Sequence, residues 1–266
     1  MDQTHKKNTY FISDLHLGLH PSDESLKREK LIVSWLKEVK PSCAALYLLG
    51  DVFDYWYEYR KVVPRGFTRF LGAIADFTDS GIPVYYFTGN HDVWVFDYLP
   101  EELGVKVFRN PLDVEINGKL FHLGHGDGLG PGDRSYKILR AVFHNKFLQF
   151  MFSRLHPNFS VSLGHMWSRK SRLSKGVFIP FMGEDKEHLI GYTRQKLLQR
   201  HYDYLIFGHR HVPMQIDFDS KSRMLCLGDW IINHTYAKFD GERLELLPYT
   251  DEDNIMRMQL PVVSSS

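Results

Sequence analysis

Five short apolar runs in this sequence are each followed by side chains that can bind a metal ion. Thiolates are absent from the set, which excludes zinc-finger and iron–sulfur chemistry. Carboxylate, amide and imidazole donors together favour divalent Mn, Fe or Zn, and the large share of oxygen donors favours Mn or Fe. The runs end in Ser13-Asp14-Leu15-His16, Gly50-Asp51, Gly89-Asn90-His91-Asp92, Gly124-His125 and Gly208-His209-Arg210-His211.

Seven candidate ligands are too many for one ion and suit two ions that share a carboxylate. Two ions about 3.5–4 Å apart can clamp a phosphoryl group and lower the pKa of a water molecule between them. The pattern therefore predicts hydrolysis of a phosphate ester or anhydride. We assign Asp14, His16 and His211 to one ion, Asn90, His125 and His209 to the other, and Asp51 to the bridge.

The runs before the ligands predict strands, and the segments between them predict helices. Ligands at the ends of parallel strands converge on one edge of a sheet. Asn117-Gly118 and Asp240-Gly241 predict tight hairpins. We expect an α/β fold with two packed mixed sheets flanked by helices. The predicted strands are Tyr10–Ser13, Ala45–Leu49, Val84–Thr88, Lys119–Leu123 and Tyr204–Phe207, and the predicted helices are Leu26–Val39, Phe67–Asp79 and Leu189–His201.

The composition is that of an ordinary soluble globular chain of 266 residues, with 43% hydrophobic and 24% charged residues. It excludes a disulfide scaffold, a disordered tail and a coiled coil. Cys43 and Cys226 stand in apolar runs and are expected to be buried, reduced thiols. No stretch has the ~18 uncharged apolar residues of a membrane span. We expect one domain over residues 1–266 with a tail at 250–266, located in the cytoplasm.

Charge is distributed unevenly despite a net charge of +1. From Arg134 to Gly183 there are nine basic and no acidic residues, so the rest of the chain has 24 basic and 32 acidic residues, a net charge of −8. Such a block favours an anionic partner. It also interrupts the α/β pattern, and we interpret residues 134–183 as a helical lid inserted into the domain.

Apolar side chains recur at helical spacing through Ser135–Leu155, on more than one face of the expected helix. A second apolar face could hold fatty-acyl chains, and each buried methylene contributes roughly 0.8 kcal/mol. We expect Phe143, Phe147 and Phe150 to belong to such a pocket, with basic residues nearby for a diphosphate or for anionic head groups.

The ordered motifs Asp-x-His, Gly-Asp-x-x-Asp, Gly-Asn-His-Asp, His-Gly-Asp and Gly-His-x-His, spread from Asp14 to His211, resemble the calcineurin-like metallophosphoesterase superfamily. The resemblance implies that His91 acts on the leaving group or stabilises charge in the transition state. It also implies a catalytic role for Asp92, as the residue that orients His91.

A narrower resemblance, to the UDP-2,3-diacylglucosamine pyrophosphatases of lipid A biosynthesis, begins after His125 in His125-Gly126-Asp127-Gly128-Leu129 and Gly132-Asp133-Arg134-Ser135-Tyr136. It implies cleavage of an acylated UDP-sugar to UMP and an acyl-sugar 1-phosphate. For the two ions of the ligand set we expect Mn first, with Fe or Zn as alternatives, and we expect the lid to contact the inner membrane surface peripherally, where such a substrate would be embedded. This chain departs from the family pattern at His91, where many members have Arg, and at Gly128, where the family has Thr. The implied substrate contacts are Asn90, His91, Asp133, Arg140, Ser174, Lys175 and His209.

Two alternatives stay open. A nuclease or general phosphodiesterase would use the basic block for nucleic acid, although the dense Phe content of Ser135–Phe152 makes nucleic acid the less favoured partner. A non-catalytic scaffold would keep the fold and bind partners through the lid, but such proteins usually lose ligands, and none of the seven is missing.

Overall fold

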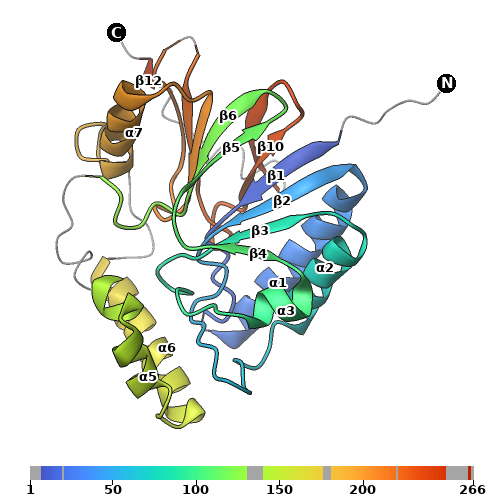
Figure 1. The fold of residues 1–266 in the computed structure, drawn as a ribbon, viewed down its shortest axis with the longest axis vertical. Helices are drawn as coiled ribbons and strands as arrows, with labels where there is room; N and C mark the ends of the chain where they lie inside the picture. Colours follow the sequence, from blue (N-terminus) through green and yellow to red (C-terminus); the bar gives the residue numbers. More distant parts are fainter. Residues whose placement is uncertain are drawn as a thin grey trace.

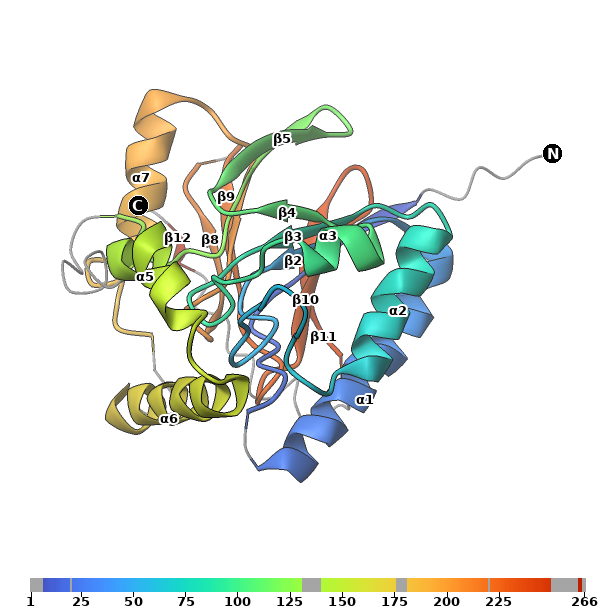
Figure 2. The same ribbon diagram turned by 60° about the horizontal axis from the view of Figure 1, so that its bottom comes forward.

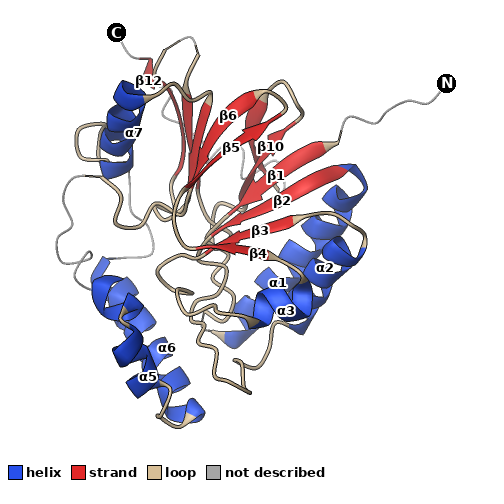
Figure 3. Cartoon of the chain, viewed as in Figure 1, coloured by secondary structure: helices blue, strands red, loops and turns tan. Residues whose placement is uncertain are grey.

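The computed structural model describes residues 7–19, 21–130, 140–175, 181–219, 221–249 and 263–264, with the backbone alone for 169–175 and 263–264. Two β-sheets lie face to face in the centre of the molecule, and helices cover their outer faces (Figures 1 and 3). The predicted α/β architecture of two mixed sheets flanked by helices is confirmed.

The first sheet has the strand order β11-β10-β1-β2-β3-β4. Its four strands β1 to β4 run parallel, while β10 and β11 complete the sheet in antiparallel pairing. Each parallel connection carries a helix, as parallel pairing requires. The elements are β1 (Asn8–Ile12), α1 (Ser22–Val39), the 3₁₀ turn η1 (Lys40–Ser42), β2 (Cys43–Leu49), α2 (Thr68–Asp79), β3 (Val84–Phe87), α3 (Tyr98–Leu103), β4 (Lys106–Phe108), β10 (Thr235–Phe239) and β11 (Leu244–Pro248).

The second sheet has the strand order β12-β8-β9-β7-β6-β5. The strands β6, β7 and β9 run parallel, and β5 and β8 pair antiparallel at either side of them. Helix α7 covers its outer face. The elements are β5 (Leu112–Ile116), β6 (Lys119–Leu123), α7 (His188–Gln199), β7 (Tyr204–Phe207), β8 (Pro213–Asp217), β9 (Arg223–Leu227) and the short β12 (Val263–Ser264).

Three apolar cores hold these layers together. Alternate side chains of one strand face opposite layers, so in β1 Tyr10 and Ile12 pack under α1 and α2, while Phe11 packs between the sheets. Phe11 stacks on Phe121 of the second sheet at a centroid distance of 5.8 Å. A third core joins α7 to the second sheet through Leu189 and Phe207. The sheets are thereby fixed against each other beside the ligand-bearing loops.

Two further helices, α5 (Lys146–Phe152) and α6 (Pro157–Lys175), lie apart from the layered body, beside the loops that follow β1, β2 and β3 (Figures 1 and 2). We call α5 and α6 the cap. The predicted unbroken helix over Ser135–Leu155 is wrong in its described part, because the Asn145 side chain accepts hydrogen bonds from the Phe147 and Leu148 amides and begins a new helix there. Residues 131–139 lie outside the described part of the chain.

Most predicted elements have their expected positions, within a few residues at each end. Both hairpin turns are present, with Asn117 and Gly118 at positive φ. Cys43 and Cys226 are both buried free thiols, as expected. No helix in the described ranges has the length and apolar character needed to cross a membrane.

Candidate metal centre

The candidate ligands occupy turns directly after the carboxyl ends of β1, β2, β3, β6 and β7, which meet at one end of the two sheets. Side chains other than Gly rarely adopt positive φ, and those that do are concentrated at functional sites. Eight such residues occur in the described chain, and the following five belong to the candidate ligand set: Asp14 (54°), His16 (43°), Asp51 (51°), His209 (68°) and His211 (56°).

Two glycines let the ligand loops approach each other closely. A Cβ atom at Gly89 would overlap the Asp51 carboxylate, and a Cβ at Gly208 would overlap the Asp14 carboxylate. The Gly before a ligand therefore makes room for the carboxylate of a neighbouring loop. This packing explains in steric terms why the strand–Gly–ligand pattern recurs.

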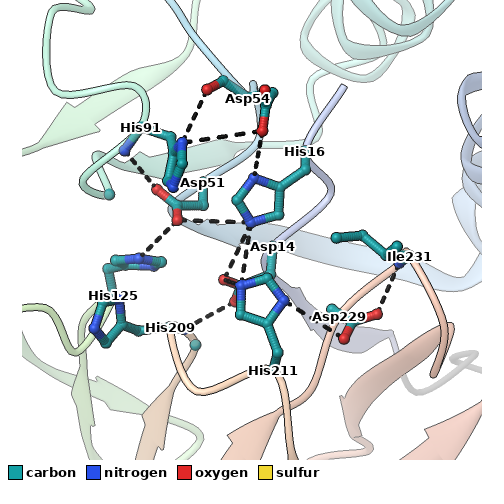
Figure 4. A network of polar contacts seen from close by, with 12 residues as sticks. Asp14, His16, Asp51, Asp54, His91, His125, His209, His211, Asp229 and Ile231 are labelled. Carbon is teal, nitrogen blue, oxygen red and sulfur yellow. Dashed lines mark hydrogen bonds and ion pairs between the residues drawn. The ribbon is translucent and has the colours of Figure 1, made fainter. Parts of the chain in front are cut away.

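The candidate ligand atoms form three overlapping groups (Figure 4), which are Asp14, His16 and His211, then Asp51, His125 and His209, and a third of His16, Asp51 and His91 that joins the other two. In the first, His211 Nε2 lies 3.4 Å from Asp14 Oδ1 and 3.3 Å from His16 Nε2. In the second, His125 Nε2 lies 3.4 Å from Asp51 Oδ2, and the His125 and His209 ring centroids are 5.2 Å apart. His16 Nε2 is 3.7 Å from the same Asp51 oxygen. The structure thus brings these six side chains together, with Asp51 between the groups.

Three of these imidazoles are oriented by a partner at their outer nitrogen. His125 Nδ1 lies 2.8 Å from the Leu49 carbonyl oxygen. The outer nitrogens of His16 and His211 each lie 3.5 Å from a carboxylate, that of Asp54 and Asp229 respectively. Outer partners of this kind fix the tautomer, so that Nε2 points inward as a metal-binding nitrogen.

The electrostatics of the cluster favour a cation. Burial raises the pKa of Asp14, but the charge of His211 and the nearby His16 imidazole outweigh it and leave that pKa at about 2. Burial likewise opposes ionisation of Asp51, yet His125 and His91 hold its pKa well below the ordinary value. Burial disfavours a charged His125, whereas the Asp51 carboxylate raises its pKa well above the ordinary value. Both carboxylates are therefore ionised in a nearly dry site.

Several buried donor atoms fit a metal ion. Among the described residues, Asp14 Oδ1, Asn90 Oδ1 and His125 Nε2 are buried side-chain atoms without a hydrogen-bond partner. Buried polar atoms without partners are costly and require an explanation. A divalent ion would satisfy oxygen and nitrogen atoms of this kind together. The donor set therefore fits the metal ions that the sequence predicts.

His91 lies beside the cluster, but its partner differs from the one we expected. His91 Nδ1 lies 2.9 Å from the Asp54 carbonyl oxygen. The Asp92 carboxylate instead accepts hydrogen bonds from the Gly89 amide at 2.7 Å, the Val52 amide at 2.8 Å and the Tyr86 hydroxyl at 2.5 Å. Asp92 therefore braces the loops after β2 and β3, and the expectation that it orients His91 is replaced by the contact with Asp54.

An apolar cavity of about 260 Å³ opens beside His91 and Asn90. The loops after β2 and β3 form one wall and the cap forms the other. Phe143, just before α5, also lines the cavity, as expected, but Phe147 and Phe150 are 69% and 52% exposed and do not line it, so the expected pocket is only partly correct. The lining residues are Asp54, Tyr55, Asn90, His91, Trp94, Phe143, Phe152, Leu163, Gly164 and Trp167.

The remaining predicted substrate contacts are placed only in part. Arg140 lies in a shallow groove with His125 and Asp127, and its guanidinium is 3.5 Å from the Asp127 carbonyl oxygen. Asp133 lies outside the described residues, as do the side chains of Ser174 and Lys175.

Two supporting interactions were not predicted from the sequence. Asp229 accepts the amides of Ile231 and Ile232 as well as facing His211. The only sequence signal for it is its place in a Gly-Asp-Trp motif after β9. Arg210, between the two ligand histidines, forms a buried pair with Glu187 at 2.7 and 2.8 Å and attaches the ligand loop to the start of α7.

The fold and the cluster are those of a metal-dependent phosphoesterase. The family model for the calcineurin-like phosphoesterases matches residues 7–213, and the chain belongs to this family of metal-dependent hydrolases. Three relatives are each named UDP-2,3-diacylglucosamine hydrolase. The protein from Porphyromonas gingivalis is 38% identical over 91% of this chain and 97% of its own length. Those from Edwardsiella ictaluri and Vibrio vulnificus are each 28% identical, over 95% and 92% of this chain and 97% and 99% of their own lengths.

Proposed function

We propose that this protein is a dimetal phosphohydrolase that cleaves the diphosphate of UDP-2,3-diacylglucosamine to UMP and 2,3-diacylglucosamine 1-phosphate, a step of lipid A biosynthesis. The observation that carries the proposal is the continuity between the ligand cluster and the apolar cavity, since His91 lies in one candidate ligand group with His16 and Asp51 and also lines the cavity. A diphosphate at the cluster would place an attached acyl chain in the cavity. The names of the relatives support the same substrate.

The seven side chains Asp14, His16, Asp51, Asn90, His125, His209 and His211 are the residues that would hold two divalent ions, with Mn favoured by the oxygen share of the set. Bound ions would neutralise charge on the phosphoryl oxygens and lower the pKa of a water molecule. His16, His125 and His211 need no reorientation for this, because their outer nitrogens are already held.

We propose that His91 stabilises the charge that develops on the departing phosphoryl group. A carbonyl oxygen can only accept a hydrogen bond, so the Asp54 carbonyl requires a proton on His91 Nδ1. In the protonated imidazole, His91 Nε2 would also donate, to a phosphoryl oxygen at the mouth of the cavity. Arg140 lies with His125 in a groove that is separate from the apolar cavity, and there it would contact the nucleotide half of the substrate.

The outer surface of the cap supports a membrane contact. Large apolar side chains are exposed there, among them Phe147, Phe150 and Met166, and Lys146 and Arg154 lie on the same helical hairpin. Exposed apolar patches with basic neighbours bind anionic lipid surfaces. We propose peripheral contact with the anionic inner membrane surface, where a substrate with two acyl chains would be embedded.

The test uses the full-length protein with Mn²⁺ and UDP-2,3-diacylglucosamine in mixed micelles. We expect release of UMP, its loss after chelation, and its recovery when Mn²⁺ is added back. A soluble diester such as bis-p-nitrophenyl phosphate serves as the comparison substrate. Hydrolysis of the diester without release of UMP from the lipid would disprove the substrate assignment while leaving the metal-dependent hydrolase intact.

A further inference from the structure

The cap helix α6 is hydrogen-bonded to the side chain of Asp54, the residue that contacts the outer nitrogens of both His16 and His91. The Ser168 hydroxyl donates to Asp54 Oδ2 at 2.9 Å, and the two residues are only 1% and 3% exposed. The other carboxylate oxygen, Asp54 Oδ1, lies 3.5 Å from His16 Nδ1 and 4.0 Å from His91 Nδ1. One buried carboxylate therefore contacts the cap on one side and the ligand cluster on the other.

The backbone of Asp54 is also hydrogen-bonded next to both imidazoles. Its amide donates to the Leu17 carbonyl oxygen at 2.9 Å, one residue after His16, and its own carbonyl oxygen accepts from His91 Nδ1. A displacement of Asp54 would consequently disturb both His16 and His91. Hydrogen bonds in such a dry location are directional and strong, so a small shift at one end is transmitted to the other.

Helix α6 contacts the loop after β2 along a single face. Ser160, Gly164 and Ser168 are four residues apart, which places them on one side of the helix. The Ser160 hydroxyl is hydrogen-bonded to the Tyr59 hydroxyl, and Gly164 approaches Tyr55 so closely that a Cβ there would overlap the ring. Of these three residues, Ser168 is the one that contacts Asp54, which is itself a partner of the candidate ligand His16.

The same part of α6 forms a wall of the apolar cavity. Leu163, Gly164 and Trp167 line it from the helix, and Asp54 and Tyr55 line it from the loop. An acyl chain in this cavity would touch both surfaces. A bound acyl chain would therefore add contacts that fix the position of α6 over Asp54. When the cavity is empty, fewer contacts hold α6 in that position.

We propose that Ser168 is a positioning residue which, through Asp54, holds His16 for the metal ion in the empty site and aligns His91 when the apolar cavity is filled, so that an acylated substrate promotes its own cleavage. The proposal rests on the proposed function for the identity of that substrate. It adds that the cap does more than hold acyl chains, because its hydrogen bond to Asp54 adjusts the site.

The test compares Ser168→Ala with Ser162→Ala, a matched control on the same helix. The Ser162 hydroxyl is exposed and donates to the Asn158 carbonyl oxygen within α6. For Ser168→Ala we expect roughly a 10-fold lower kcat on UDP-2,3-diacylglucosamine, at the lower end of the range for outer partners of metal ligands. We expect KM and the rate on bis-p-nitrophenyl phosphate to change less than twofold. Ser162→Ala should match the wild type, and Ser168→Thr, which keeps the hydroxyl, should recover most of the kcat.

A second readout needs no substrate. Titration calorimetry of the metal-free protein with Mn²⁺ should show weaker binding of one ion, about 10-fold, in Ser168→Ala and not in Ser162→Ala. A change in KM alone would overturn the proposal and leave Ser168 as a residue that only holds α6, and with it the wall of the cavity, against the loop. Equal loss on both substrates together with a lowered Tm would make its role structural. If the wild type releases no UMP from the lipid, the proposed function fails, but the Mn²⁺ titration still tests the link from Ser168 to the ligands.

Discussion

The metal-binding end of the molecule and the cap are built in opposite ways. At the metal end, buried side chains are held in left-handed turns, and outer partners fix the rings of His16, His125 and His211. In the cap, side chains as large as Phe147 and Met166 are mostly exposed, and the described contacts of α6 with the body run along one face. Rigidity is concentrated where chemistry needs fixed geometry, and adaptable apolar surface where a flexible chain must be received.

Because of this difference, we expect mutations in the two regions to have different energetic effects. A change at the metal end removes or misaligns a ligand in a dry site, where electrostatic interactions are strong. A change in the cap removes apolar contact, and its effect grows with the area that the contact covers. We therefore expect effects on the rate at the metal end and effects on substrate and surface binding in the cap, with Ser168 as the link between them.

The largest effect is expected for Asp51→Asn, because Asp51 shares one ligand group with His16 and another with His125 and His209, and is almost fully buried. We expect kcat to fall by about 10³-fold or more and the bound Mn to decrease, as measured by UMP release and elemental analysis. Asp76→Asn, which removes an exposed carboxylate paired with Lys40, is the control and should change neither. An Asp51→Asn protein with more than a tenth of the normal rate would contradict a shared carboxylate.

The next largest effect is on stability and separates buried from exposed ion pairs. Arg210→Met would leave the buried, charged Glu187 without Arg210 as its partner. We expect the free energy of unfolding, measured with urea, to fall by about 3–5 kcal/mol. Arg194→Met, which breaks the exposed pair with Glu184, should lower the free energy of unfolding by less than about 1 kcal/mol. Similar losses for the two variants would show that burial does not distinguish these pairs.

The metal end could be predicted from the sequence because each of its ligands comes directly after a strand. The strand ends at Leu49, Leu123 and Phe207 were predicted as observed, and parallel strands bring the residues after them to one edge. The outer partner of each imidazole could not be predicted. The contacts of His91 with Asp54 and of His211 with Asp229 join residues 37 and 18 positions apart through loop geometry, and a periodic pattern carries no signal for them.

The cap was less predictable for a physical reason. A helix that is apolar on several sides does not reveal which side faces the body and which faces outward. Helical spacing alone placed Phe143, Phe147 and Phe150 in one pocket, whereas the break at Asn145 turns Phe147 and Phe150 outward. The contact of Gly164 with Tyr55 is equally invisible in sequence, because a small residue within a helix has several possible reasons.

A third prediction tests the inner surface of the cap. Phe152 lines the cavity and stacks on Trp94 at a centroid distance of 5.3 Å. We expect Phe152→Ala to raise KM for the diacylated substrate about 10-fold, since several methylene contacts are lost, and to leave kcat on bis-p-nitrophenyl phosphate within twofold. Phe147→Ala, in the same helix but exposed, should leave KM in mixed micelles nearly unchanged. Equal changes in the two variants would contradict the division into inner and outer surfaces.

A smaller, pH-dependent effect is expected from His122, which is buried between Asp113 and Tyr192 behind the metal end. Burial lowers the pKa of His122 below 6.5, although Asp113 opposes the shift. The unfolded chain therefore binds a proton more readily, so this contribution to stability is complete above pH 6.5 and is lost as the pH falls below it. Urea unfolding at pH 7.5 and 5.5 should show a decrease for the wild type and a weaker one for His122→Gln. An unchanged pH dependence in the variant would exclude His122 as its source.

The smallest effect on the folded protein, and the most selective, is expected on the outer surface of the cap. Phe147 and Met151 are one helical turn apart and both exposed, so changing both to Ser should alter the free energy of unfolding by less than about 0.5 kcal/mol. Binding to anionic phosphatidylglycerol vesicles should nevertheless weaken, by roughly three- to tenfold in a flotation assay, because these side chains would enter the lipid interface. The matched control is Leu198→Ser on α7, which removes an apolar side chain that is 88% exposed but lies away from the cap. Vesicle binding that falls equally in the control, or not at all in the cap variant, would mean that the outer surface of the cap is not the membrane contact.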